Sequence, residues 1–180
     1  ETRTYACDPD TLALLGSRYA LLRPEFLSWK DRPRVVAKTA RKVLVTLGGA
    51  DPDNATLAVV EALARLKAPD LEAVVVLGAD NPHEKVLRAA GKDKPGLRFE
   101  RNVLDMPALM AWADIAVTAG GSTCWETAFM GLPNLILVLA DNQRGGAKAL
   151  EEAGVSLAYG AAALESLLGD AQRRERMSAA

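Results

Sequence analysis

The stretch IAVTAGGSTCWETAFM (residues 115–130) combines an apolar run, a glycine-containing loop and a helical segment in immediate succession. Residues 115–118 predict a buried β-strand, because β-branched side chains dominate them and a glycine pair follows shortly after. Residues 123–130 predict a helix that ends at Gly131. A strand that leads directly into a helix is the repeating unit of a parallel β-sheet, so this stretch indicates the α/β class.

The same succession recurs on both sides of this stretch. Further strands are predicted over residues 43–47, 73–77, 97–100, 134–139 and 155–159, and further helices over residues 55–67, 82–90, 106–113 and 144–153. Because the strands are continuous apolar runs, we expect both of their faces to be buried. The sequence therefore predicts an α/β fold, a Rossmann-like parallel sheet with helices on both faces.

The composition of the 180-residue chain excludes several classes of function. Its formal net charge of −1 provides no basic surface for a nucleic acid, and its longest apolar run, residues 135–140, is too short to span a membrane. His83 is the one histidine, and Cys7 and Cys124 lie far apart, so neither a zinc site nor a histidine-dependent hydrolase triad is predicted. We expect no metal and no cofactor, and we interpret both cysteines as reduced thiols of a cytoplasmic protein.

The two ends of the chain differ from its centre. Residues 1–40 carry several charges, two prolines and only short apolar runs, so we interpret them as a leading segment packed on the domain or part of an inter-domain hinge. Residues 41–180 are predicted to form the domain itself. Within them, residues 171–180 predict a charged helix that is cut short, with residues 173–176 as a solvated face.

The loop after the strand at 115–118 carries the sharpest chemical signal. Ligands of open parallel sheets bind outside the carboxyl ends of the strands. Gly120 and Gly121 let a ligand approach the backbone, and Ser122 and Thr123 add hydroxyl groups at a helix start that favours anions. Glu126, one turn into the helix, has a carboxylate that can accept hydrogen bonds from two ribose hydroxyls. A capping box, in which Thr123 and Glu126 only satisfy backbone donors, is an equally good interpretation.

Two further loops are weaker candidates. Gly48 and Gly49 can approach a phosphate or a sugar, although a tight turn capped by Asp51 explains the same residues. Asn142 and Gln143 carry amides that recognise sugar hydroxyls or phosphate oxygens, although a solvated loop also explains them.

Motifs that would indicate other nucleotide sites are missing. Neither a P-loop nor a G-x-G-x-x-G dinucleotide motif is present. We expect His83 to be an exposed residue at a helix start, without a catalytic role.

Four segments resemble a known enzyme family. They are LLGSRYALLRPEF (residues 14–26), VLVTLGGADPDNAT (residues 43–56), DMPALMAWADIAVTAGGSTCWETAFMGLP (residues 105–133) and LVLADNQ (residues 137–143). Together they resemble the C-terminal half of the UDP-sugar hydrolase of pseudaminic acid biosynthesis. More distantly, they are similar to the lipid II-forming N-acetylglucosaminyltransferase, so the resemblance implies the C-terminal half of a GT-B fold.

The resemblance implies an activity for the whole protein and a role for this half of it. Family members cleave a UDP-2,4-diacetamido-2,4,6-trideoxyhexose into UDP and free sugar without a metal. The catalytic histidine of that family belongs to an N-terminal domain, which is the implied partner of this chain. We therefore expect a UDP-sugar hydrolase whose catalytic residue lies outside this chain. We expect the chain alone to bind UDP weakly and not to hydrolyse the UDP-sugar.

The resemblance also assigns roles to residues by position. Residues 120–123 are expected to contact the diphosphate and Glu126 the ribose, while the loop of Asn102, Val103 and Leu104 pairs with uracil through its backbone. Gly48 and Gly49 are expected at the UDP, and Asn142 and Gln143 at the sugar or the phosphates.

Three other functions remain open from the sequence. One is a GT-B glycosyltransferase that uses a UDP-sugar donor, since it shares the same UDP site. Another is a non-catalytic module that binds a nucleotide sugar, and the last is a purely structural α/β domain.

Overall fold

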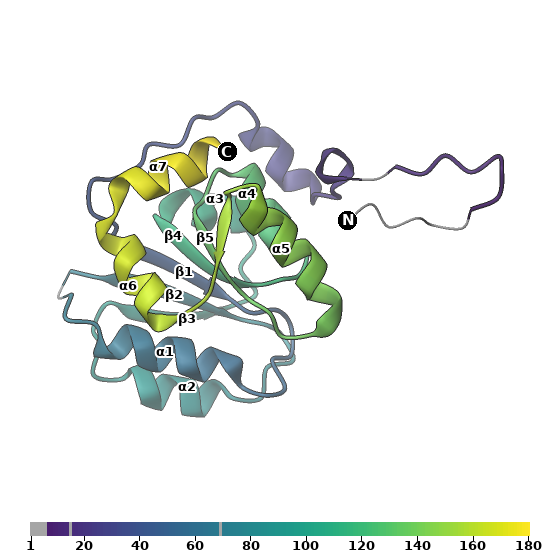
Figure 1. Ribbon diagram of the computed structural model, residues 1–180. Coiled ribbons are helices and arrows are strands. Elements are labelled where there is room, and N and C mark those ends of the chain that lie inside the picture. The colour runs from purple at the N-terminus through teal and green to yellow at the C-terminus, as the bar shows by residue number, and fades with distance from the viewer. Residues whose placement is uncertain (1–6, 15, 69) are drawn as a thin grey trace.

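The computed structural model, which describes residues 7–14, 16–68 and 70–180, contains a six-stranded parallel β-sheet with helices on both faces (Figure 1). The strands are β1 (Lys42–Thr46), β2 (Glu72–Leu77), β3 (Leu97–Arg101), β4 (Ile115–Ala119), β5 (Asn134–Leu137) and β6 (Ser156–Ala158). The α-helices are α1 (Ala55–Arg65), α2 (Glu84–Gly91), α3 (Met106–Trp112), α4 (Thr123–Phe129), α5 (Arg144–Glu152), α6 (Ala161–Gly169) and α7 (Ala171–Ala179). The 3-10 helices are η1 (Ser17–Tyr19), η2 (Pro24–Trp29) and η3 (Asp141–Gln143). The predicted Rossmann-like α/β architecture is confirmed.

The order of the strands creates a crevice at the centre of the sheet. The order is β3-β2-β1-β4-β5-β6, so the chain moves outward from β1 in one direction and then returns to start again at β4 on the other side. β1 and β4 pair directly, with Val45 opposite Val117. In open α/β sheets, ligands bind at such a switch point, outside the carboxyl ends of the two central strands.

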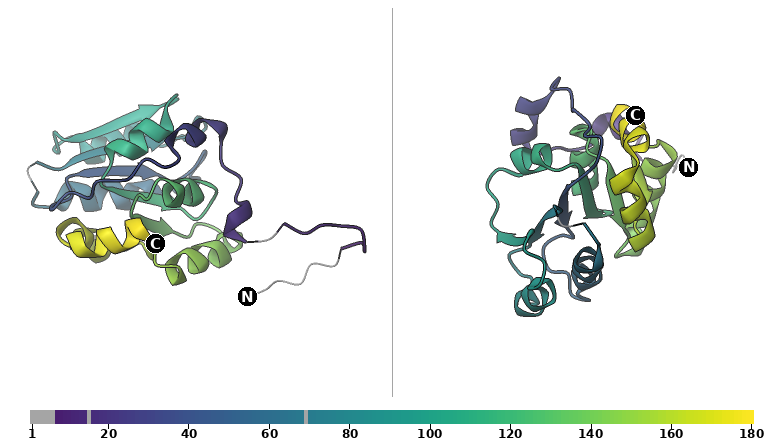
Figure 2. Two further views of the ribbon diagram at one scale, coloured as in Figure 1. Left: turned by 90° about the horizontal axis from the view of Figure 1, so that it is seen from above. Right: turned by 90° about the vertical axis from the view of Figure 1, so that its left-hand side faces the viewer.

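Side chains alternate between the two faces of the sheet, and a different set of helices covers each face (Figure 2). Val43 and Val45 of β1 pack in the larger core cluster, which contains residues from α1, α2, α6 and α7. Leu44 points the other way, into a cluster that contains Met110 of α3 and Phe26 of η2. The period-2 alternation of a β-strand explains why neighbouring residues of β1 serve different cores.

The C-terminal helices differ from the sequence prediction. The segment that forms α6 was not predicted as a helix, since Gly160 precedes it and provides no capping side chain. Helix α7 was predicted, but the interpretation of residues 173–176 as a solvated face is wrong for Arg174. This side chain is fully buried and donates to the carbonyl oxygens of Leu167, Leu168, Ala37 and Lys38. A buried guanidinium that satisfies several carbonyls joins chain segments that no local pattern connects.

The leading segment contacts the sheet domain at several places after residue 20. Phe26 of η2 is fully buried, and Arg34 donates to the carbonyl oxygens of Met110, Ala113 and Met130 at 2.6–3.1 Å. Residues 7–14 instead run away from the sheet (Figure 2), with Leu12 and Leu14 exposed. In the described part of the chain, no helix is long and apolar enough to cross a membrane.

Candidate functional site

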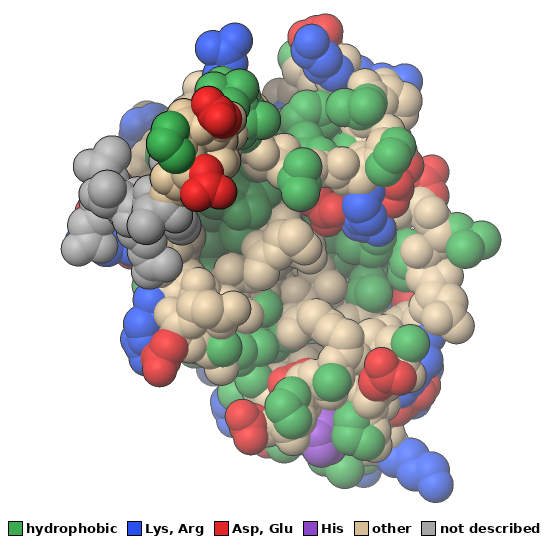
Figure 3. All heavy atoms as spheres, turned by 90° about the vertical axis from the view of Figure 1, so that its right-hand side faces the viewer, with side chains coloured by type: hydrophobic (Ala, Val, Ile, Leu, Met, Phe, Trp, Pro, Cys, Tyr) green, Lys and Arg blue, Asp and Glu red, His purple; other side chains and the backbone are tan. Residues whose placement is uncertain are grey.

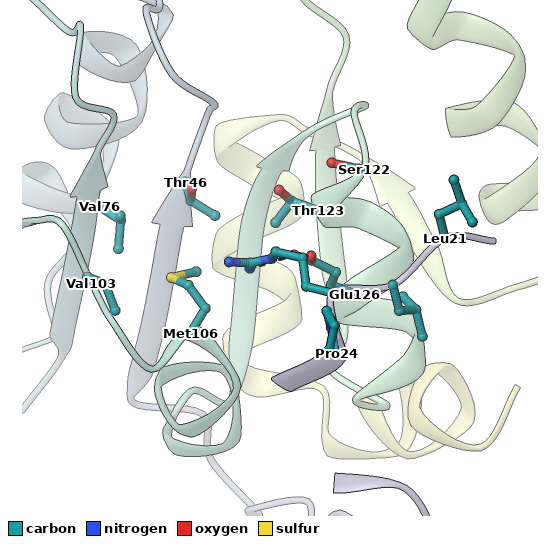
Figure 4. Close-up of a pocket in the computed structure, with 11 residues that line it drawn as sticks. Leu21, Pro24, Thr46, Val76, Val103, Met106, Ser122, Thr123 and Glu126 are labelled. Atoms are coloured by element: carbon teal, nitrogen blue, oxygen red, sulfur yellow. Dashed lines mark hydrogen bonds and ion pairs between the residues drawn. The ribbon is translucent and has the colours of Figure 1, made fainter. Parts of the chain in front are cut away.

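A cavity of about 650 Å³ opens at the carboxyl ends of β1 and β2, between α3 and α4 (Figure 4). Its walls come from β1 and β2, from the start of α3, from the start of α4 directly after β4, and from the leading segment. The lining residues are Leu21, Leu22, Arg23, Pro24, Thr46, Val76, Val103, Met106, Ser122, Thr123 and Glu126. Seen from the right-hand side of Figure 1, the molecule is hollowed, and the hollow shows mainly backbone and uncharged side chains (Figure 3). The cavity therefore lies at the switch point of the sheet, where a ligand is expected.

Glu126 is a buried carboxylate at this cavity. Glu126 is the fourth residue of α4, and only 4% of its side chain is exposed. Its Oε1 accepts a hydrogen bond from Nε of Arg23 at 2.7 Å, and its Oε2 accepts one from Nη2 of the same residue at 3.1 Å. The capping-box interpretation is wrong, because Ser122 rather than Thr123 precedes the helix and the Glu126 carboxylate faces Arg23 instead of the backbone.

Arg23 comes from the leading segment and is the main residue that the sequence did not reveal. It directly precedes η2, which starts at Pro24, and the fully buried Phe26 anchors that helix in the core. The guanidinium also lies 5.1 Å from the Phe26 ring centroid and 3.1 Å from Oε1 of Glu25. The hydrogen bond to Glu126 raises the pKa of Arg23, although partial burial acts in the opposite direction. The only sequence signal for Arg23 is its place in LLRPEF, next to the proline that starts η2.

The two glycines of the loop after β4 have different surroundings. A Cβ on Gly120 would lie 2.9 Å from Cβ of Gln143, so packing against Gln143 requires glycine there. A Cβ on Gly121 would meet no atom within 4 Å. Within the described part of the chain, the backbone N–H groups of Gly121 and Ser122 have no hydrogen-bond acceptor. The loop therefore presents unpaired donors and an open approach at the same point.

Cys124 lies beneath this loop. Its Sγ donates to the carbonyl oxygen of Gly121 at 2.7 Å, and burial raises the pKa of the thiol to about 11. The neutral thiol thus stays a donor to the loop at neutral pH.

The loop after β1 has a different construction. Gly48 adopts a φ of +96°. The backbone of Gly49 packs tightly on Gly78, so a Cβ on Gly78 would lie 2.0 Å from the Gly49 carbonyl oxygen. Asp51 is buried and accepts hydrogen bonds from the N–H groups of Ala55 and Thr56, at 2.7 and 3.0 Å. Asp51 thus satisfies the first N–H groups of α1 as expected, although Asn54 occupies the N-cap position and the helix begins at Ala55. Neither Gly48 nor Gly49 lines the cavity.

The two other predicted loops contribute unequally. Val103 lines the cavity, whereas Asn102, at a φ of +52°, is exposed and Leu104 is 96% exposed. Asn142 is exposed, and the Oε1 of Gln143 accepts the N–H of Leu139 at 2.9 Å within its own loop.

The structure thus separates the predicted site residues into two groups. The cavity brings together Val103, Ser122, Thr123 and Glu126; the residues that do not line it are Gly48, Gly49, Asn102, Leu104, Gly120, Gly121, Asn142 and Gln143. All of their roles toward UDP stay predictions. His83 precedes α2, and its Nε2 lies 3.2 Å from the carbonyl oxygen of Pro52, away from the cavity lining. Among the described residues, no group of three or more His, Cys, Asp or Glu side chains is placed to hold a metal ion.

Comparison with known proteins identifies the family. The family model described as "Glycosyltransferase family 28 C-terminal domain" matches residues 42–177, which cover the whole sheet. The chain belongs to this family. The expectation that the full-length protein is a UDP-sugar hydrolase is wrong, because the matched family is one of glycosyltransferases, which pass a sugar to an acceptor. Neither the family nor its relative SpsG shows a link to the pseudaminic acid pathway, and the glycosyltransferase alternative fits the family better.

One curated relative is similar to most of this chain. The family 28 domain is 31% identical over 148 residues to the spore coat polysaccharide biosynthesis protein SpsG of Bacillus subtilis (strain 168), covering 81% of this chain and 43% of that protein. The chain therefore spans less than half the length of this relative.

Solved structures share the fold. The glycotransferase of kitacinnamycin aligns with a TM-score of 0.62 and 20% identity, over 83% of this chain and 40% of its own. The Anabaena protein Alr3699/HepE, solved with UDP and glucose, aligns with a TM-score of 0.59 and 16% identity, over 91% of this chain and 48% of its own. The predicted C-terminal half of a GT-B fold is thereby confirmed.

Proposed function

We propose that this family 28 domain binds the UDP part of a UDP-sugar donor and holds UDP as the leaving group of a glycosyltransferase. The observation that carries the proposal is the buried Glu126 carboxylate, which lines the cavity next to a glycine loop with unpaired N–H groups. A ribose needs a paired acceptor for two vicinal hydroxyls, and a diphosphate needs donors nearby. This site holds both.

The assignment of the loop after β4 follows from its donors. We place the diphosphate against the N–H groups of Gly121 and Ser122 and the hydroxyls of Ser122 and Thr123, while Glu126 receives the ribose hydroxyls. Donors fixed by the fold stabilise the charge that develops on a departing diphosphate. The base is assigned to the loop of residues 102–104, where Val103 lines the same cavity. The complex of Alr3699/HepE with UDP and glucose supports UDP as the ligand class.

The rest of the donor extends beyond this cavity. We assign Asn142 and Gln143 to the sugar or the phosphates, and Gly48 and Gly49 to a second contact at the same edge of the sheet. In the proposed reaction, an acceptor oxygen attacks the anomeric carbon and the bond from this carbon to UDP breaks. We assign the acceptor site and the base that takes its proton to an N-terminal domain of the same protein, with residues 1–40 as the hinge. The name of SpsG supports an acceptor in polysaccharide assembly.

The test is a titration of the chain with UDP and 2′-deoxy-UDP, followed by calorimetry and by the shift in Tm. We expect UDP to bind and to raise Tm at millimolar concentration. Glu126→Gln is expected to weaken UDP binding about tenfold or more, because a hydrogen bond to a charged acceptor contributes about 1.5–3 kcal/mol. On the native chain, 2′-deoxy-UDP is expected to bind less tightly than UDP. On the Glu126→Gln variant, the two ligands are expected to bind equally tightly.

The matched control is Glu151→Gln, on an exposed carboxylate of α5 that lies outside the cavity lining. It is expected to bind UDP like the native chain. An absence of UDP binding, or equal loss in both variants, would contradict the proposed site.

A further inference from the structure

The pairing of Arg23 with Glu126 raises a problem for ribose binding. The guanidinium donates through two N–H groups to the two carboxylate oxygens. A vicinal diol donates through two hydroxyls to the same pair of oxygens, so both groups match the same edge of the carboxylate. Since only 4% of the Glu126 side chain is exposed, no second open edge is available to the diol. Arg23 and the ribose therefore compete for Glu126.

The charges in the cavity indicate what the displaced guanidinium would bind. Arg23 is the only basic side chain among the lining residues, and Glu126 the only acidic one. A diphosphate brings negative charges into this cavity, and Arg side chains bind phosphate oxygens through a fork of N–H groups. Ser122 and Thr123, assigned above to the diphosphate, line the same cavity as Arg23.

The leading segment allows the guanidinium to move while its backbone stays in place. Pro24 starts η2 and Phe26 is fully buried, so the backbone next to Arg23 is anchored. The Arg23 side chain is 47% exposed, and its other contacts are the half-exposed Glu25 and the face of Phe26. Breaking the exposed ion pair with Glu25 costs little, because water solvates both charges once they separate.

We propose that Arg23 is the diphosphate-binding cation of this site, and that it pairs with Glu126 only until the ribose hydroxyls replace it. The inference rests on the proposed function, since it takes UDP as the ligand. The guanidinium then serves two partners in turn: it neutralises the buried carboxylate in the empty site and the diphosphate in the filled one. No other described residue of the cavity can neutralise either group.

This exchange has a signature that a purely structural ion pair lacks. Removal of Arg23 takes away the cation for the diphosphate, so UDP binds more weakly. The same removal takes away the competitor of the ribose, so uridine, which has no phosphate, binds more tightly. The two ligands are thus affected in opposite directions by one substitution.

The experiment compares UDP and uridine on the native chain and on Arg23→Ala by calorimetry at low ionic strength. We expect the Kd of UDP to rise about tenfold, which corresponds to about 1.4 kcal/mol, and the Kd of uridine to fall. Arg23→Lys keeps the charge but loses the fork, and is expected to retain most of the UDP affinity. In the double variant Arg23→Ala/Glu126→Gln, the gain in uridine affinity should disappear.

The matched control is Arg32→Ala, an arginine of the same segment that stacks on Trp29 at 4.6 Å and lies outside the cavity lining. It is expected to bind both ligands like the native chain. If Arg23→Ala does not fold, as judged by Tm, Arg23→Lys is compared with the native chain instead. Uridine should then bind the Arg23→Lys variant more tightly than the native chain.

The outcomes separate this inference from the proposed function. If the native chain does not bind UDP, the proposed function fails. If the native chain binds UDP but removal of Arg23 changes neither affinity, or shifts both in the same direction, only the role of Arg23 is overturned.

Discussion

Two loops with paired glycines leave the carboxyl edge of the sheet, and they differ in how their polar groups are satisfied. The loop after β1 turns back on its own chain: Asp51 accepts two N–H groups at the start of α1, and Gly49 is packed on Gly78. The loop after β4 leaves the N–H groups of Gly121 and Ser122 unpaired in the described structure.

Paired glycines therefore have two different structural roles in this protein. In the first loop, Gly48 adopts a left-handed backbone conformation that favours glycine, and the backbone of Gly49 packs closely against Gly78. In the second, Gly120 makes room for Gln143 and Gly121 keeps the approach open. We therefore expect substitutions in the first loop to act on stability, and those at the open position of the second to act on ligand binding.

The largest effect is expected for Gly78→Ala. The new Cβ would lie 2.0 Å from the carbonyl oxygen of Gly49, and backbone atoms on both sides must move to relieve the contact. We expect a loss of about 3 kcal/mol in the free energy of unfolding, measured by urea denaturation. Gly169→Ala, where a Cβ meets nothing within 4 Å, is the control. Equal stability of the two variants would mean that the first loop is not tightly packed.

Asp51→Ala is expected to have the next largest effect. It removes two hydrogen bonds at a buried helix start, and loss of such a cap costs about 2 kcal/mol. In a chain of this size that corresponds to a fall in Tm of about 4–8 °C. Asp53→Ala, at an exposed aspartate of the same loop, should leave Tm unchanged. A change in UDP affinity larger than the change in stability would contradict the structural role of this loop.

Gly121→Ala tests the second loop. Because a Cβ at this position meets no protein atom, stability should be unchanged. The methyl group instead occupies the approach to the unpaired N–H groups, so we expect UDP to bind about tenfold more weakly, or about 1.4 kcal/mol. Gly169→Ala, where a Cβ also meets open space and which lies outside the cavity lining, is the matched control. An equal loss of UDP affinity in both variants would contradict the role of the loop after β4.

The smallest effect concerns the thiol beneath the second loop. With a pKa of about 11, raised by burial, only about one thousandth of Cys124 is thiolate at pH 8. Iodoacetamide at pH 8 should therefore label the exposed Cys7 and leave Cys124 unlabelled, as mass spectrometry of the peptides can show. Because the thiolate fraction rises with pH, labelling of Cys124 should increase toward pH 10. Rapid labelling at pH 8 would mean that the loop opens readily.

The fold followed from the sequence because its signals are local. Buried apolar runs, glycines after strands and Asp51 before α1 each act within a few residues, and the structure has these elements within a few positions of their predicted bounds. The site was predicted less completely. Ser122, Thr123 and Glu126 were placed at the cavity, but Gln143 uses its Oε1 inside its own loop and Leu104 points into solvent. Spacing shows which residues share a loop, but it does not show where their side chains point.

The residue pattern alone predicts that this chain forms a parallel α/β sheet and that Glu126 follows a glycine loop at its carboxyl edge. The contact of Arg23 with that carboxylate, 103 residues away, and the burial of Arg174 became visible only in the folded chain. The two kinds of feature depend on interactions of different range. Hydrogen bonds within a strand or a turn follow from neighbouring residues, whereas an ion pair between distant segments depends on how the core positions both of them.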